Sequence, residues 1–228
     1  NKVVTGKPNS TDPEAPKQQS IFGKIGGFLK GIFKPRFGFT NTDNNVASNT
    51  TSFSNNAGNS TGESGAGDII NNFPYYNQGD PNWGKKGYGP GTIASSGCGP
   101  TSMAMVMKSY GTNVTPVDTV QYSLDHGFRT KNQGTAWGYF ANIARANGLT
   151  AEQYDGGQKG IEVTKAKLAS NIPVIGSMRP GDFTKGGHFV VFSGIDQDGT
   201  IRVNDPSSRE RSTKKWGAQQ ALSQAKQF

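Results

Sequence analysis

Residues 95–102 are Ser-Ser-Gly-Cys-Gly-Pro-Thr-Ser, and they hold the single cysteine of the 228-residue chain, Cys98. Gly97 and Gly99 flank it, and small neighbours let a substrate and the backbone approach the sulfur closely. The apolar pattern over residues 98–110 predicts a helix that begins at this cysteine. A thiolate is favoured at the positive end of a helix dipole, where free backbone N–H groups can also bind an oxyanion. The alternative is a buried structural cysteine in a Gly-rich turn.

A thiolate nucleophile needs a base, and the chain has two histidines, His126 and His188. His188 follows two glycines and opens the β-branched and aromatic run 188–193, which predicts a buried strand. A histidine at the mouth of such a strand is held rigidly and can face a cleft. His126 falls at the end of a helix predicted over residues 116–125, where a cation is merely favourable. We therefore expect His188 to be the general base.

The histidine in turn needs an acceptor that orients its ring. Asp205 follows the alternating segment 200–204, which predicts a second strand. If the two strands pair as a hairpin around residues 196–199, the chain returns to His188 and Asp205 can accept from the ring N–H. Asn204 is the alternative acceptor, and an ordinary Asp-Pro turn is the third reading of the same residues.

The rest of this region mixes helical and stranded patterns. The pattern predicts helices first and strands later, which is typical of an α+β domain with the nucleophile helix packed on an antiparallel sheet that carries His and Asp. The domain is expected to span residues 68–228. Its predicted helices are 98–110, 116–125, 135–147 and 164–170, and its predicted strands are 173–177, 188–193 and 200–204.

Residues 1–67 are expected to be a flexible N-terminal extension. Within it, residues 20–34 place apolar side chains on one face of a helix that four glycines weaken. We expect this segment to pack against another part of its parent protein or a partner protein, or to lie on a membrane surface, with simple disorder as the alternative. The contact would be made by Ile21, Phe22, Phe28, Leu29 and Phe33. Residues 38–67 are rich in Asn, Ser, Thr and Gly, which predicts a flexible linker.

Composition narrows the class of function. The net charge is +8, but no Lys/Arg-rich run concentrates it, so we expect no nucleic-acid partner. A spread positive charge suits an anionic surface such as a bacterial cell wall. One cysteine and two histidines argue against a structural zinc site, and we expect no metal and no cofactor. The chain begins at Asn1 rather than Met, which suggests a fragment or a processed product.

Several motifs resemble a known family, the papain-like cysteine peptidases of the bacteriocin-processing (double-glycine peptidase-like) type, and more closely its stand-alone bacterial and phage branch. The resemblance covers roughly residues 69–216. The motifs stand in the family's order, Cys then His then Asp: Gln78-Gly79-Asp80-Pro81-Asn82-Trp83, Tyr88-Gly89, residues 95–102, Gly187-His188-Phe189-Val190-Val191 and Val203-Asn204-Asp205-Pro206.

The resemblance implies a Cys-His-Asp triad, with Cys98 as nucleophile, His188 as base and Asp205 as orienting residue. Gln78 resembles the glutamine that contributes to the oxyanion hole. In leader-processing members that glutamine lies a few residues before the cysteine, where this chain has Thr92. Residues expected to contact the substrate are Gly97, Gly99, Trp83 and Gly187.

The expected activity is hydrolysis of an amide bond. The leader-processing relatives sit on transporters with long apolar spans, and this sequence has no such run. We therefore expect a peptidoglycan-degrading endopeptidase that acts on bacterial cell-wall peptides, located in a phage virion (tail) or secreted to the cell surface. One alternative is a protease that processes a protein or its own precursor. Another is a cell-wall or membrane-binding module that has lost catalysis.

Overall fold

The computed structural model describes residues 67–131 and 134–228. The predicted amphipathic segment 20–34, and all but the last residue of the predicted linker 38–67, lie outside these ranges. The expectations for them stay predictions.

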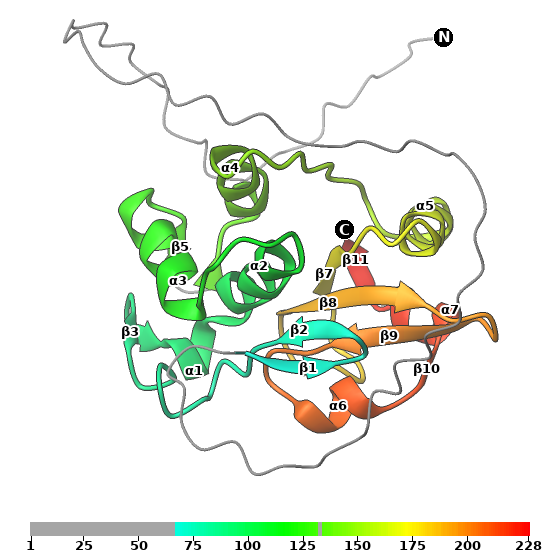
Figure 1. Ribbon diagram of the computed structural model, residues 1–228, viewed down its shortest axis with the longest axis horizontal. Coiled ribbons are helices and arrows are strands. Elements are labelled where there is room, and N and C mark those ends of the chain that lie inside the picture. Colours follow the sequence, from blue (N-terminus) through cyan, green and yellow to red (C-terminus); the bar gives the residue numbers. More distant parts are fainter. Residues whose placement is uncertain (1–66, 132–133) are drawn as a thin grey trace, which may run out of the picture. The chain divides into compact units, whose positions relative to one another are not determined.

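A five-stranded antiparallel sheet with the order β10-β9-β8-β7-β11 forms the centre of the described part (Figure 1). β8 and β9 form a hairpin in which the N–H of Asp196 donates to the carbonyl of Thr200 at 2.9 Å. This confirms the hairpin predicted around residues 196–199. The strands are β7 (Val174–Met178), β8 (His188–Ile195), β9 (Thr200–Asn204), β10 (Trp216–Gly217) and β11 (Ala225–Gln227).

The central strand β8 joins two hydrophobic cores, because successive side chains of a strand point to opposite faces. Val190 and Phe192 belong to one core together with Leu168 of helix α5 (Gln158–Ala169). Val191 belongs to the other core together with Met105 of helix α2 (Cys98–Ser109). The strand is therefore held from both sides, which fixes the position of its first residue, His188.

The helical part contains α1, α2, α3 and α4, with bounds Ile93–Ser96, Cys98–Ser109, Pro116–Asp125 and Gly138–Ala146. The helices predicted over residues 98–110 and 116–125 are confirmed. α4 begins three residues later than predicted because residues Gly134–Thr135 form β6, which pairs with β5 (Arg129–Thr130). α5 begins six residues earlier than its prediction. The expected α+β class is confirmed.

A tight hairpin, β1 (Asp68–Ile70) and β2 (Phe73–Tyr75), ties the start of the domain to the sheet. Its two-residue turn has positive φ at Asn71 (60°) and Asn72 (56°), as a type I′ turn requires. The Asn71 amide donates to the carbonyl of Val203 at 3.0 Å. The remaining short elements are β3 (Gly87–Tyr88), β4 (Gly91–Thr92), α6 (Arg209–Thr213) and α7 (Ala218–Leu222).

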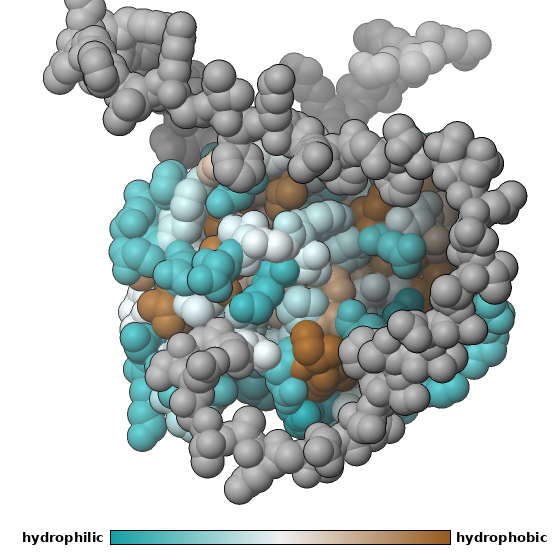
Figure 2. Space-filling view, viewed as in Figure 1, coloured by the Kyte–Doolittle hydropathy of each residue, from teal (hydrophilic) through white to brown (hydrophobic). Residues whose placement is uncertain are grey.

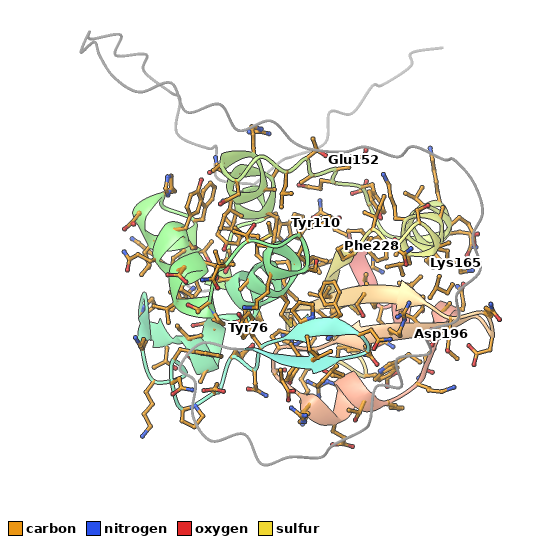
Figure 3. All side chains as sticks on the ribbon, in the orientation of Figure 1. Tyr76, Tyr110, Glu152, Lys165, Asp196 and Phe228 are labelled. Atoms are coloured by element: carbon orange, nitrogen blue, oxygen red, sulfur yellow. The ribbon has the colours of Figure 1, made fainter. Side chains whose placement is uncertain are left out.

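The coloured part of the face drawn in Figure 2 is mostly teal or white, with separate brown patches among the polar side chains. A groove of about 440 Å³ has Tyr110, Glu152 and Phe228 in its lining, all labelled in Figure 3. Tyr110 at its rim is half exposed. Across residues 67–131 and 134–228, no helix has the length and apolar character needed to cross a membrane.

Candidate active site

Cys98 is the first residue of α2, directly after a break between two helices. At the break the N–H of Gly97 donates to the carbonyl of Ile93 at 2.8 Å and closes α1. A Cβ atom on Gly97 would lie 2.6 Å from that carbonyl oxygen, so the turn needs a glycine. Gly97 is buried while Cys98 is partly exposed. The break therefore presents the sulfur at the N-terminus of α2, where backbone N–H groups are free.

His188 opens β8, and its imidazole is 8% exposed. Its Nε2 lies 2.8 Å from Oδ1 of Asp205. Burial lowers the pKa of His188, but hydrogen bonds to Asp205 and Cys98, together with the negative charges of both, outweigh burial and raise it to about 9. The imidazolium form is therefore favoured at neutral pH, held between the Cys98 sulfur and the Asp205 carboxylate.

Asp205 follows β9 and is fully buried. Burial raises the pKa of its carboxyl, but hydrogen bonds from His188, the Arg211 side chain and the Ser207 N–H hold that pKa below its ordinary value of 3.8. Asn204, the alternative acceptor, uses its amide elsewhere: it donates to the carbonyl of Ile70 at 3.1 Å. Asp205, not Asn204, therefore contacts the histidine.

The structure brings Gln78 between the two halves of the site. Its backbone N–H donates to the carbonyl of Pro206 at 2.7 Å, next to Asp205. Its Nε2 donates to the carbonyl of Ala94 in α1 at 2.6 Å, which leaves one of its two N–H donors unused. Thr92, at the position that the leader-processing members give to glutamine, is the N-cap of α1 and accepts from Ser95 N–H at 3.3 Å.

The four residues expected to contact substrate have different surroundings. Gly187 is exposed, and a Cβ on it would meet nothing within 4 Å, so it borders open space beside His188. Gly99 is buried, and a Cβ on it would lie 2.9 Å from the Thr135 hydroxyl. For Gly97 and Gly99, close packing accounts for the glycine.

Trp83 corrects one expectation. It is 5% exposed, its ring packs edge-on against Tyr76 at 5.5 Å between centroids, and its indole N–H donates to the carbonyl of Asn77 at 2.7 Å. The ring belongs to the hydrophobic core and has no free face for a substrate. The prediction that Trp83 contacts substrate is therefore wrong.

The other histidine, His126, lies at the C-terminal end of α3 and is exposed. Its ring stacks on Tyr122 with the centroids 3.9 Å apart, and its Nδ1 lies 2.9 Å from the carbonyl oxygen of the same residue. These contacts lie within α3 and its end, and it is His188 that contacts Asp205.

Two residues at the site escaped the sequence analysis, Ser207 and Arg211. Both follow Asp205 within six positions, and both contact its carboxylate or the histidine. Nothing in their pattern pointed to chemistry, since a serine and an arginine in a polar loop are ordinary surface residues. Their nearness in sequence to Asp205 was the one available signal.

Taken together, the site holds a partly exposed thiol, an imidazole beside it and a buried carboxylate behind the imidazole. This arrangement suits nucleophilic attack with proton transfer through the imidazole. Among the described residues, no group of three or more His, Cys, Asp or Glu side chains is placed to hold a metal ion.

Comparison with known protein families identifies one family whose model matches most of the described residues. Residues 70–227 match the model of a protein family described as the Peptidase_C39 like family. Six chains of solved structures match this chain. One is the crystal structure of the peptidase domain of Streptococcus ComA, a bi-functional ABC transporter involved in a quorum sensing pathway. It is 21% identical with a TM-score of 0.38, and the match covers 59% of this chain and 90% of that one. No curated protein matches.

Proposed function

The chain belongs to the Peptidase_C39-like family of cysteine peptidases, whose fold is papain-like, and we propose that it hydrolyses peptide amide bonds through Cys98, His188 and Asp205. The observation that carries the proposal is the contact chain from Cys98 through the His188 ring to Asp205. An intact nucleophile, base and orienting carboxylate favour catalysis over a module that only binds.

The proposed reaction starts from a Cys98 thiolate beside the His188 imidazolium. The thiolate attacks the amide carbonyl, and the oxyanion accepts hydrogen bonds from the Cys98 N–H and the unused N–H of Gln78. His188 then protonates the leaving amine, which departs and leaves a thioester. The now neutral His188 takes a proton from water, which attacks the thioester and releases the acid.

We propose that the substrate is a peptide of bacterial peptidoglycan. The segment from Asp68 onward holds 17 basic and 12 acidic residues, and the whole chain carries +8. Two exposed lysines lie on segments that lead into the site. Lys185 lies three residues before His188, and the backbone carbonyl of Lys86 accepts from the N–H of Ile93, at the start of α1, at 2.9 Å. Positive charge near a cleft attracts an anionic polymer such as the cell wall.

This substrate fits a protein of a phage virion or one secreted to the cell surface, and we propose that location. The apolar side chains of the N-terminal segment 20–34 would add a contact with a membrane surface or a partner protein.

The test is digestion of purified Gram-positive cell walls by the wild-type protein and by Cys98→Ala. Loss of turbidity with new free amines, absent with the variant, is the expected result. If walls stay intact while Cys98 still reacts rapidly with iodoacetamide at pH 6, the substrate is a protein rather than the wall. If neither activity appears, the chain is not a peptidase.

A further inference from the structure

We propose that Arg211, acting with Ser207, is a positioning residue of this site: it holds the Asp205 carboxylate in the one orientation that faces His188 and sets the pH range over which His188 stays protonated. The inference rests on the triad put forward above. Neither residue touches the sulfur or any reacting atom, so both act through Asp205.

Arg211 and His188 contact different oxygens of the Asp205 carboxylate. Its Nε donates to Oδ2 of Asp205 at 2.6 Å, while Oδ1 lies 2.8 Å from Nε2 of His188. A buried carboxylate needs partners on both oxygens, and a cation on one oxygen leaves the other for the imidazole. Without Arg211, Oδ2 would lose its charged donor and the carboxylate could rotate about the Cβ–Cγ bond of Asp205.

Ser207 contacts all three of the side chains that surround this carboxylate contact: Asp205, Arg211 and His188. Its hydroxyl donates to Oδ1 of Asp205 at 3.0 Å, accepts from Nη2 of Arg211 at 3.0 Å, and lies 3.1 Å from Nε2 of His188. Its backbone N–H also donates to Oδ1 at 2.8 Å. Four groups therefore share one small network, and each hydrogen bond in it restrains the others.

Local hydrogen bonds shape the segment that carries Ser207 and Arg211. The Asp205 N–H donates to the Ser212 hydroxyl at 2.8 Å, and the Ser208 hydroxyl accepts from the N–H of Arg211 at 3.1 Å as the cap of α6. These bonds fold residues 205–212 back on themselves. The Arg211 side chain is 29% exposed, so its guanidinium has the carboxylate on one side and solvent on the other.

Few other charges face this network. His188 comes from β8 and Cys98 from α2, and Tyr75 approaches from β2. Burial raises the pKa of Tyr75 above its ordinary value of 10, so it stays neutral over the range in which the histidine titrates. Arg209, on the same short helix as Arg211, pairs instead with Asp68 at the surface. Among the described residues, Arg211 is therefore the cation that contacts Asp205 directly in addition to the His188 imidazolium.

The test uses NMR of the full chain with labelled histidine, in which the imidazole signals come from two rings, those of His188 and His126. In Arg211→Met, we expect the titration of His188 to move away from that of the wild type, because loss of a nearby cation raises the pKa of the ring whereas loosening of its hydrogen bond to Asp205 lowers it. We also expect the Nε2–H resonance of His188 to broaden through exchange with water. Arg211→Lys should return the titration toward that of the wild type, because it restores the charge.

Arg209→Met is the matched control, since it removes a charge from the same helix without touching Asp205. It should leave the His188 signals unchanged. Ser207→Ala removes a neutral hydroxyl, so it should broaden the Nε2–H resonance without moving the titration. A folded Arg211→Met with wild-type titration and a sharp Nε2–H signal would overturn the inference. If Arg211→Met does not fold, a sharp and unaltered Nε2–H signal in Ser207→Ala would overturn it.

A separate arm tests the triad itself. His188→Ala should abolish the rapid reaction of Cys98 with iodoacetamide at pH 6. If that reaction persists, the triad fails. If it is lost while the Arg211 variants behave like the wild type, the triad stands and only the positioning role is overturned.

Discussion

Replacement of Asp205 by Asn should switch off Cys98 at mildly acidic pH while keeping the shape of the side chain. In the wild type, the hydrogen bond to Asp205 is the first of the interactions that raise the pKa of His188 from 6.5 to about 9. Since burial acts in the opposite direction, loss of the carboxylate leaves a buried imidazole that prefers to be neutral. The imidazolium that stabilises the thiolate is then lost.

The size of the effect follows from these values. A free thiol has a pKa of about 8.5, so roughly 0.3% of it is ionised at pH 6. A variant in which the imidazolium no longer stabilises the thiolate should react with iodoacetamide on the order of a hundredfold more slowly than the wild type. The raised pKa of His188 is large enough to account for this slowing. A rise from 6.5 to about 9 shifts the equilibrium between the protonated and neutral ring roughly 300-fold toward the protonated form.

The assay is simple because the chain has a single cysteine, so the alkylation rate reports Cys98 alone. Asp198→Asn is the matched control, because Asp198 is exposed in the turn between β8 and β9. Circular dichroism and a urea titration establish that each variant is folded. An Asp205→Asn protein that is folded and reacts as fast as wild type at pH 6 would refute the role given to the carboxylate.

Four further outcomes are expected. Because the pKa of Asp205 is held below 3.8, its contribution to stability is present above that pH and lost as the pH falls, so urea titrations should show a steeper loss from pH 5 to 2 in wild type than in Asp205→Asn. Gln78→Ala should lower kcat on cell-wall peptides by about 10²- to 10³-fold and leave Cys98 alkylation unchanged, since alkylation forms no oxyanion; equal loss of both would contradict this. Asn204→Ala, which strands the buried Ile70 carbonyl, should cost about 1–3 kcal/mol in a urea titration without slowing alkylation at pH 6. Trp216→Ala should cost about 3–5 kcal/mol, and a loss below 1 kcal/mol would exclude a core role.

The elements nearest to the chemistry were predictable because their local signals were strong. Two helices and the hairpin of β8 and β9 have clear periodicity, capping and turn residues, and they place Cys98, His188 and Asp205. Longer pairings were not visible. β10 has two residues and β11 has three, so neither carries a period of its own, and both depend on the strands beside them.

The early start of α5 shows a different limit. Its first turn contains Gly160, and Gly157 before it has φ of 85°, so propensity disfavours a helix there. Tertiary packing outweighs helix propensity at this position. A Cβ on Gly160 would lie 2.1 Å from the carbonyl oxygen of Asp155, and Ile161 is buried in the core next to the sheet. Trp83 was misjudged for a similar reason, since a motif does not say which way a ring turns.

The residues that meet at the site are far apart along the chain, since 90 positions separate Cys98 from His188 (188 minus 98). α2 can form from local contacts within microseconds, but the imidazole reaches the sulfur only after the whole antiparallel sheet has assembled against that helix. During refolding, fast alkylation at pH 6 should therefore return after the helical circular dichroism signal. The alkylation rate of Cys98 then reports the last step of folding, and a newly made chain gains its fast-reacting cysteine only when the sheet has packed against α2.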